Sequence, residues 1–177
     1  RLPIAMSQGY NPRPQISVPA PLSVGFRGEN EALDFELCRW MKPAEVGNLL
    51  GRQLPDGIAL KSMLGLPTKP DRQPRYFSYR IPLLDGHPVE AAAIKRLPQA
   101  EHLVVERTKK NEIQEKDVAE FVRYLRLEQN NLHMLLAMTN RGTARPGEIL
   151  EFLGCEAGRD YLKSSIVRTH VDLSSSL

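Results

Sequence analysis

Three short segments of the chain each begin with proline and carry glutamate two residues later. Proline suits the first turn of a helix, where no amide hydrogen is needed, and a carboxylate there meets the positive end of the helix dipole. The apolar residues that follow fit one face of a helix. The sequence therefore predicts three short helices, which begin at Pro43, Pro88 and Pro146. They end near Pro55, Pro98 and Gly154.

Runs of apolar residues separate these helices and predict strands. In the first part of the chain the predicted strands are residues 16–19, 32–38 and 57–64. In the second part they are residues 76–83, 102–107, 124–128, 132–138 and 166–173. Residues 117–122 fit either a strand or a helical face. Gln129–Asn131 predicts a tight turn, because asparagine tolerates positive φ.

The order of these elements favours a duplicated α+β fold. Residues 76–173 give β-α-β-β-α-β, the split βαβ pattern of ferredoxin-like domains, and residues 16–64 give the same pattern without its first strand and most of its first helix. We expect two ferredoxin-like units in tandem, the first truncated at its N-terminus. The predicted units are residues 1–66 and 76–177, joined by a proline-rich linker at residues 67–75.

The segment Ser7–Gln15 reads SQGYNPRPQ and predicts a stiff polar loop. Gly9 permits dihedral angles that other residues avoid, whereas Pro12 and Pro14 fix their own φ and push the residues before them towards extended geometry. One interpretation is a display loop that holds its tyrosine, asparagine and arginine side chains out towards a partner. The alternative is a connecting loop whose tyrosine packs on its own prolines.

The formal net charge of +3 is small for a nucleic-acid-binding protein, so RNA binding requires a local patch of cations. Each cation alone is typical of a solvated surface. If they meet on one face, they would bind phosphates while the loop tyrosine stacks on an unpaired base. The candidate binding residues are Ser7, Gln8, Tyr10, Asn11, Arg13, Arg27, Arg107, Lys109, Lys110, Arg141, Arg145 and Arg168.

Metal and cofactor chemistry find little support in the sequence. Cys38 and Cys155 are isolated and the four histidines are scattered, whereas zinc sites and iron–sulfur clusters need several close ligands. We expect no metal, no cofactor and two free thiols. No apolar run approaches the roughly 20 residues of a membrane helix and no leader resembles a signal peptide, which predicts a soluble, cytoplasmic protein without membrane contact.

Two acidic residues invite an enzymatic interpretation. Glu31 and Asp34 are three apart in a predicted strand and so point to opposite faces, which argues against paired acid–base catalysis. We expect ion pairs with Arg13 or Arg27 in place of catalysis, although Asp34 acting alone as a nucleophile or base is a further alternative. We predict no catalytic residue. Trp40 is expected to pack the first helix against the sheet.

Residues 6–17, MSQGYNPRPQIS, resemble the motif YSQGFNPRP(R/K)ISF of the bacterial radical SAM-linked proteins. In this motif Tyr10 replaces phenylalanine. Further similar stretches are PLSVG at 21–25, EALDFEL at 31–37, RPGEIL at 145–150 and IVRT at 166–169. That family is a domain of unknown function found beside, or fused to, radical SAM enzymes. The resemblance therefore implies a radical SAM enzyme as partner, a strand and helix preceding Arg1, and no catalytic residue.

A radical SAM enzyme holds its cluster with three cysteines, commonly CxxxCxxC, which Cys38 and Cys155 cannot supply. We therefore expect a non-catalytic accessory or substrate-binding module that works with a radical SAM enzyme, in RNA or ribosome-related modification. Two alternatives stay open. One is an independent RNA-processing or RNA-modifying enzyme of the same fold, and the other is a protein–protein adaptor without RNA contact.

Overall fold

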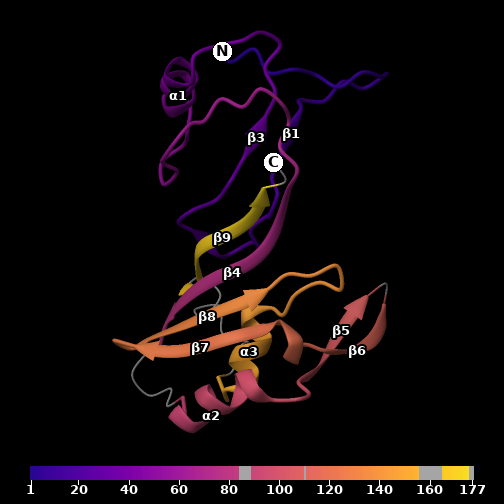
Figure 1. Ribbon diagram of the computed structural model, residues 1–177, viewed down its shortest axis with the longest axis vertical. Helices are drawn as coiled ribbons and strands as arrows, with labels where there is room; N and C mark the ends of the chain where they lie inside the picture. Colours follow the sequence, from indigo (N-terminus) through magenta and orange to yellow (C-terminus); the bar gives the residue numbers. More distant parts are fainter. Residues whose placement is uncertain (84–88, 110, 156–164, 176–177) are drawn as a thin grey trace. The chain divides into compact units, whose positions relative to one another are not determined.

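A computed structural model describes residues 1–83, 89–109, 111–155 and 165–175 of the chain (Figure 1). It is a mixed α+β protein with several sheets, and none of the helices in these ranges is long and apolar enough to span a membrane. The helices are α1 (Pro43–Gly51), α2 (Ala91–Arg96) and α3 (Pro146–Phe152). The strands are β1 (Ile16–Ser17), β2 (Arg27–Gly28), β3 (Asp34–Phe35), β4 (Arg72–Pro82), β5 (Val104–Lys109), β6 (Glu112–Asp117), β7 (Val122–Glu128), β8 (Asn131–Ala137) and β9 (Val167–Ser175).

The chain forms two compact units. Unit 1 consists mainly of Arg1–Pro19 and Ala32–Arg72, and unit 2 of Ala20–Glu31 and Gln73–Ser174. The sequence predicts residues 20–31 as part of the first unit, whereas in the structure they pack with unit 2. The chain therefore enters unit 2 once before α1 and again at β4.

Unit 1 holds α1 and the antiparallel pair β1–β3, in which Ile16 lies opposite Phe35. The helix begins at Pro43, as predicted. The predicted strand at residues 57–64 is wrong: these residues are irregular, and their apolar side chains are largely exposed instead of covering a sheet. Trp40 is 80% exposed, so the prediction that it packs α1 against a sheet is also wrong.

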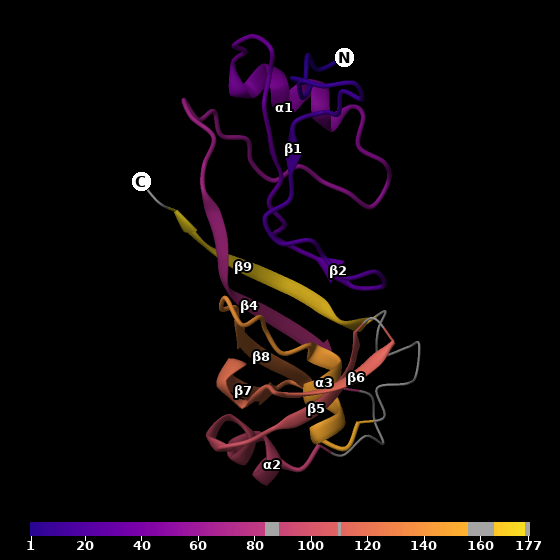
Figure 2. The same cartoon turned by 90° about the vertical axis from the view of Figure 1, so that its right-hand side faces the viewer.

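Unit 2 is built on a five-stranded sheet in the order β2-β9-β4-β8-β7 (Figures 1 and 2). Strands β4 and β8 are antiparallel, and their buried residues lie opposite one another. The cross-strand pairs are Phe77 with Leu136, Tyr79 with Met134, and Ile81 with Leu132. This alternation gives the sheet one apolar face, which packs in a single core with side chains from α2 and α3.

The chain order of unit 2 confirms much of the local prediction. Strands β4, β7, β8 and β9, and helices α2 and α3, lie close to where the sequence places them. A tight turn joins β7 and β8, as predicted, and it consists of Gln129 and Asn130, which have φ of 45° and 63°. Strand β6 was not predicted, because its sequence EIQEKD lacks the apolar alternation of a half-buried strand. It pairs with β5 as an antiparallel hairpin.

An ion pair between a buried arginine and a partly exposed glutamate fixes residues 20–31 on unit 2. Strand β2 runs parallel to β9, with Arg27 opposite Val167. The Arg168 side chain is 3% exposed, and its guanidinium donates to both oxygens of the Glu31 carboxylate and to the Ala20 carbonyl at 2.5 Å. It also lies 5.4 Å from the centre of the Phe77 ring. A buried charge with this many partners is costly to leave unpaired.

We predict that Arg168→Leu lowers the free energy of unfolding by about 2 kcal/mol, because it leaves the Ala20 carbonyl and the partly exposed Glu31 carboxylate without their donor. Arg80→Leu is the matched control: its pair with Glu29 ties the same segment to β4 but is exposed, so the loss should stay below about 1 kcal/mol. Urea unfolding followed by circular dichroism measures both. Equal losses would contradict the assignment of Arg168 as the anchor.

Candidate functional site

The two ends of the polar loop of unit 1 are both hydrogen-bonded to Glu36, the residue that follows β3. The Ala5 amide donates to the Glu36 carbonyl at 2.8 Å, and the Glu36 amide donates to the Gln15 carbonyl at 3.1 Å. The Gln15 amide in turn donates to the Ala5 carbonyl at 2.8 Å. Residues 6–14 therefore form a loop whose two ends are hydrogen-bonded to each other and to Glu36.

Further bonds close the stem of this loop. Met6 and Pro14 form an antiparallel bridge, and the Ser7 amide donates to the Arg13 carbonyl at 2.7 Å. The Arg13 amide donates to the Ser7 hydroxyl at 2.9 Å. The Ser7 side chain is thus engaged inside the loop, where it braces the stem.

The tip of the loop faces solvent. Gln8, Tyr10, Asn11 and Arg13 are all exposed, and Tyr10 is exposed as fully as in an extended chain. Gly9 supplies the turn, with φ of +138°. Because Tyr10 is fully exposed, it does not pack on the neighbouring prolines. That the exposed tip meets a partner stays a prediction.

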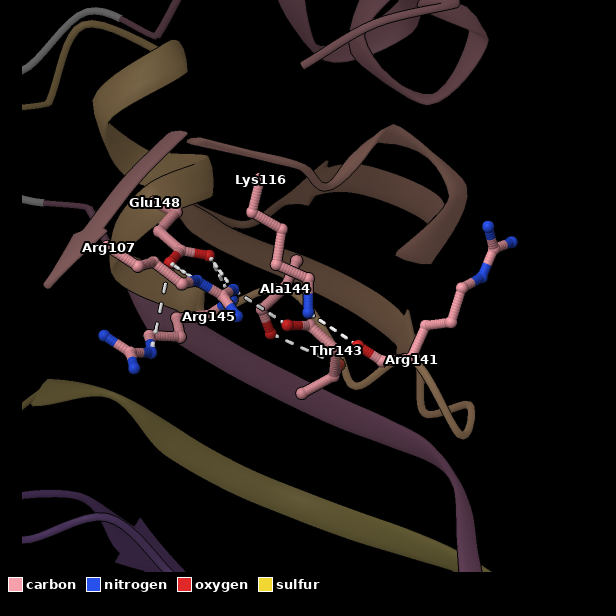
Figure 3. A network of polar contacts seen from close by, with 7 residues as sticks. All are labelled: Arg107, Lys116, Arg141, Thr143, Ala144, Arg145 and Glu148. Atoms are coloured by element: carbon pink, nitrogen blue, oxygen red, sulfur yellow. Dashed lines mark hydrogen bonds and ion pairs between the residues drawn. The ribbon is translucent and has the colours of Figure 1, made fainter. Parts of the chain in front are cut away.

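In unit 2 a second group of candidate residues lies around Glu148 and the loop between β8 and α3 (Figure 3). Arg107 of β5 donates from Nε and Nη2 to the two oxygens of Glu148, both at 2.7 Å. Nη2 also donates to the Thr143 carbonyl at 2.8 Å. The two side chains are only 17% and 11% exposed. Arg107 is therefore committed to internal contacts and offers little to a ligand.

Lys116 of β6 belongs to the same group and was missed by sequence reasoning. Its Nζ donates to the Arg141 carbonyl at 2.6 Å and lies 5.3 Å from the centre of the buried Phe121 ring. The position of Lys116 near Arg107 can be recognised only once the pairing of β5 with β6 is known. The register places Lys116 opposite Val105, two positions from Arg107 on β5 and hence on the same face of the ribbon.

Arg141 and Arg145 lie in the loop between β8 and α3 and are the exposed cations of this group. The Arg141 side chain is 73% exposed and donates one Nη to Glu120. The Arg145 side chain is 69% exposed, and its Nε lies 3.9 Å from Glu148. The Arg145 backbone amide donates to Glu148 at 2.8 Å. Both guanidinium groups project from the loop (Figure 3).

The remaining candidate cations differ in environment. Arg27 is exposed on β2, whereas Arg168 is buried in the ion pair described above. Lys109 ends β5, and Lys110 lies outside the described residues. The loop of residues 7–13 belongs to unit 1 and the other candidates to unit 2, so their predicted meeting on one face stays a prediction.

The two acidic residues that invited a catalytic interpretation form ion pairs with partners other than those predicted. Glu31 pairs with Arg168, and Asp34 pairs with Arg72 at 3.2 Å. The expectation of ion pairs is confirmed in kind. The predicted partners, Arg13 and Arg27, are wrong, because the β2–β9 pairing brings Glu31 beside a residue 137 positions away in sequence.

The cysteines are free thiols, as predicted, with Cys38 exposed and Cys155 buried. Burial raises the pKa of the Cys155 thiol, which favours its unreactive protonated form. Within the described ranges, no three side chains of histidine, cysteine, aspartate or glutamate gather closely enough to hold a metal ion.

Asp117 closes the base of the β5–β6 hairpin. Its carboxylate accepts hydrogen bonds from the Leu103 and Ala119 amides, each at 3.0 Å, and lies 2.7 Å from His102 Nδ1. In that order of importance, these contacts lower the pKa of Asp117 to about 2. Asp117 therefore helps to hold the hairpin that carries Arg107 and Lys116.

We predict that Asp117 titrates at about pH 2. Because its folded pKa lies below the unfolded value of about 3.9, its stabilising contribution is complete above that value and is lost as the pH falls towards 2. Asp117→Asn should accordingly lower stability at neutral pH and lose this effect in strong acid. A carboxyl carbon NMR titration measures the midpoint, and a value near 4 would contradict the three-donor geometry.

Comparison with known proteins identifies a family without an assigned activity. No curated protein and no solved structure matches the chain. The family model described as "Uncharacterized protein conserved in bacteria (DUF2344)" matches residues 1–146, which is most of the sequence. The chain therefore belongs to this family of uncharacterized conserved bacterial proteins.

Proposed function

We propose that the chain is a non-catalytic accessory module that binds substrate for a radical SAM enzyme, in the modification of RNA or of ribosome-related molecules. The observation that carries the proposal is the loop of residues 6–14. Its stem is closed by backbone hydrogen bonds while Tyr10 at its tip is bare. A side chain held out by a braced backbone loses little conformational freedom on binding, so this geometry favours recognition.

The radical SAM partner rests on the resemblance of residues 6–17 to the radical SAM-linked motif. The bonds around Ser7 and Glu36 add a physical reason for that motif: its serine closes the stem, its glycine turns the tip and its prolines stiffen the returning arm. The motif therefore encodes a display device, which is what an accessory module needs.

We also propose a ferredoxin-like architecture for unit 2. The order β9-β4-β8-β7, with α2 following β4 and α3 following β8, supports it. The hairpin β5–β6 is then an insertion after α2, and β2 is an added edge strand. In unit 1, the pair β1–β3 followed by α1 supports only a fragment of the same pattern.

A second candidate function, a protein–protein adaptor without RNA contact, is favoured by the surface of unit 1. Residues 1–19 and 32–72 are all described, and among them only Val46 is buried. Trp40, Leu64 and Ile58 are 80%, 74% and 60% exposed. Aromatic and aliphatic side chains at the surface are typical of protein interfaces, so unit 1 is the part we assign to contact with the enzyme.

The proposal predicts that Tyr10→Ala combined with Arg13→Ala removes binding without affecting the fold. The affinity-tagged protein, purified from its native cells, should carry a CxxxCxxC protein identified by mass spectrometry, together with RNA identified by sequencing. The tip variant should carry at least about tenfold less of both, because a loss of about 1.4 kcal/mol is tenfold in affinity. Its thermal melt should be unchanged, since both residues are exposed.

Tyr124→Ala combined with Arg126→Ala is the matched control, with the same residue types removed from exposed positions on β7. It should behave like the native protein. Enzyme without RNA would replace the proposal by the adaptor function. Absence of any radical SAM enzyme from the native sample would refute the partnership.

A further inference from the structure

The hairpin β5–β6 holds the loop that joins β8 to α3 through two side chains (Figure 3). Arg107 donates to the Thr143 carbonyl at 2.8 Å, and Lys116 donates to the Arg141 carbonyl at 2.6 Å. Two strands that are distant in sequence from the loop therefore bind alternate carbonyls of its backbone. Residues 139–145 are called the clamped loop below.

The clamped loop is also bonded within itself. The amides of Thr139 and Gly142 each donate to the other's carbonyl at 2.9 Å, and the Arg141 amide donates to the Thr139 hydroxyl at 3.1 Å. Gly142 has φ of +110°, a conformation that favours glycine, and a Cβ there would lie 2.9 Å from Lys116 Nζ. The turn thus favours glycine, and a Cβ at this position would also displace the end of the Lys116 side chain from the Arg141 carbonyl.

The positive charges of Arg107, Lys116, Arg141 and Arg145 are not equally neutralised by carboxylates. Glu148 already accepts from Arg107 on both oxygens and from the Arg145 amide, so it has little capacity left for the Arg145 guanidinium. Arg141 shares one Nη with Glu120 and is otherwise in solvent. Glu148 pairs closely with Arg107 and Glu120 pairs with Arg141, whereas Lys116 binds a carbonyl and Arg145 lies 3.9 Å from Glu148. Of these four cations, Arg141 and Arg145 have the exposed side chains, and each keeps guanidinium N–H groups in solvent.

We propose that Arg141 and Arg145 bind backbone phosphates of RNA, and that Arg107 and Lys116 are positioning residues that hold the clamped loop without touching the ligand. This inference rests on the proposed function and names its ligand contact. Guanidinium groups match phosphate oxygens with paired hydrogen bonds, and a loop already fixed in place loses little freedom on binding.

The surface of the clamped loop favours RNA over a protein partner. Its exposed residues are Asn140, Arg141 and Arg145, all polar, and its apolar residue Ala144 is buried. A protein interface needs an apolar centre, which this surface lacks. Phosphate contacts need only cations and donors in a fixed frame, and they position RNA without reading its sequence.

Binding is measured by fluorescence anisotropy with a labelled oligouridylate of about 16 nucleotides, over about 50 to 200 mM salt. Arg141→Ala and Arg145→Ala should each weaken binding about tenfold and reduce the slope of log affinity against log salt by about 0.7, the value for one phosphate contact on a single strand. Arg126→Ala, an exposed arginine on β7, is the control and should leave both quantities unchanged.

Gly142→Ala tests the clamp without changing any charge. It should weaken binding severalfold with an unchanged salt slope, and hydrogen exchange at the amides of Thr139 and Gly142 should speed up. Lys116→Met should act in the same way. A slope reduced by about 0.7 in Lys116→Met would instead make Lys116 a phosphate contact.

Three results would overturn the inference: no binding of the oligouridylate by the native protein, Arg141→Ala and Arg145→Ala variants that match the Arg126→Ala control, or native affinity in Gly142→Ala. Each leaves the partnership with a radical SAM enzyme standing, because that is measured by co-purification. Conversely, loss of the enzyme partnership with intact oligouridylate binding would refute the proposed function alone.

Discussion

The Arg107 guanidinium joins three parts of unit 2 at one point. It meets both oxygens of Glu148 at the start of α3 and the carbonyl of Thr143 in the clamped loop, while its own backbone is part of β5. Because this paired contact is largely shielded from water, removing one partner costs more than it does in an exposed ion pair. It also uses up the acceptor that would otherwise neutralise Arg145. The exposed Arg145 is therefore available to a ligand because the shielded Arg107 occupies Glu148.

Much of the fold is local and is predictable for that reason. Pro43 and Pro146 begin helices because the first helical turn needs no amide hydrogen, and the Gln129–Asn130 turn follows from backbone dihedrals that asparagine tolerates. Long-range pairing is not encoded in this way. Strand β2 is two residues long and is defined only by its pairing with β9, so no periodicity in the sequence predicts it. The charged strand β6 is recognisable only through its partner β5.

In the candidate site, too, the local features are predictable from the sequence and the long-range contacts are not. The stiffness of residues 6–14 follows from Gly9 and the two prolines, and the sequence predicts it. The sequence leaves open whether Tyr10 is exposed, and the hydrogen bonds of Ser7 and Glu36 that close the loop are seen only in the structure. Which arginines are free is decided by tertiary neighbours. Arg107 and Arg168 look like surface cations in the sequence, but each is paired with a glutamate that the fold brings to it. A count of the positive residues in the sequence therefore overestimates the number of cations that are free to bind a phosphate.

Ultraviolet cross-linking of bound RNA, with the modified peptides identified by mass spectrometry, tests most directly whether the braced loops are the contact surface. The account predicts nucleotide adducts on residues 8–13 of unit 1 and on residues 139–145 of unit 2. Adducts confined to other exposed side chains, such as Tyr124 and Arg126 on β7, would contradict it.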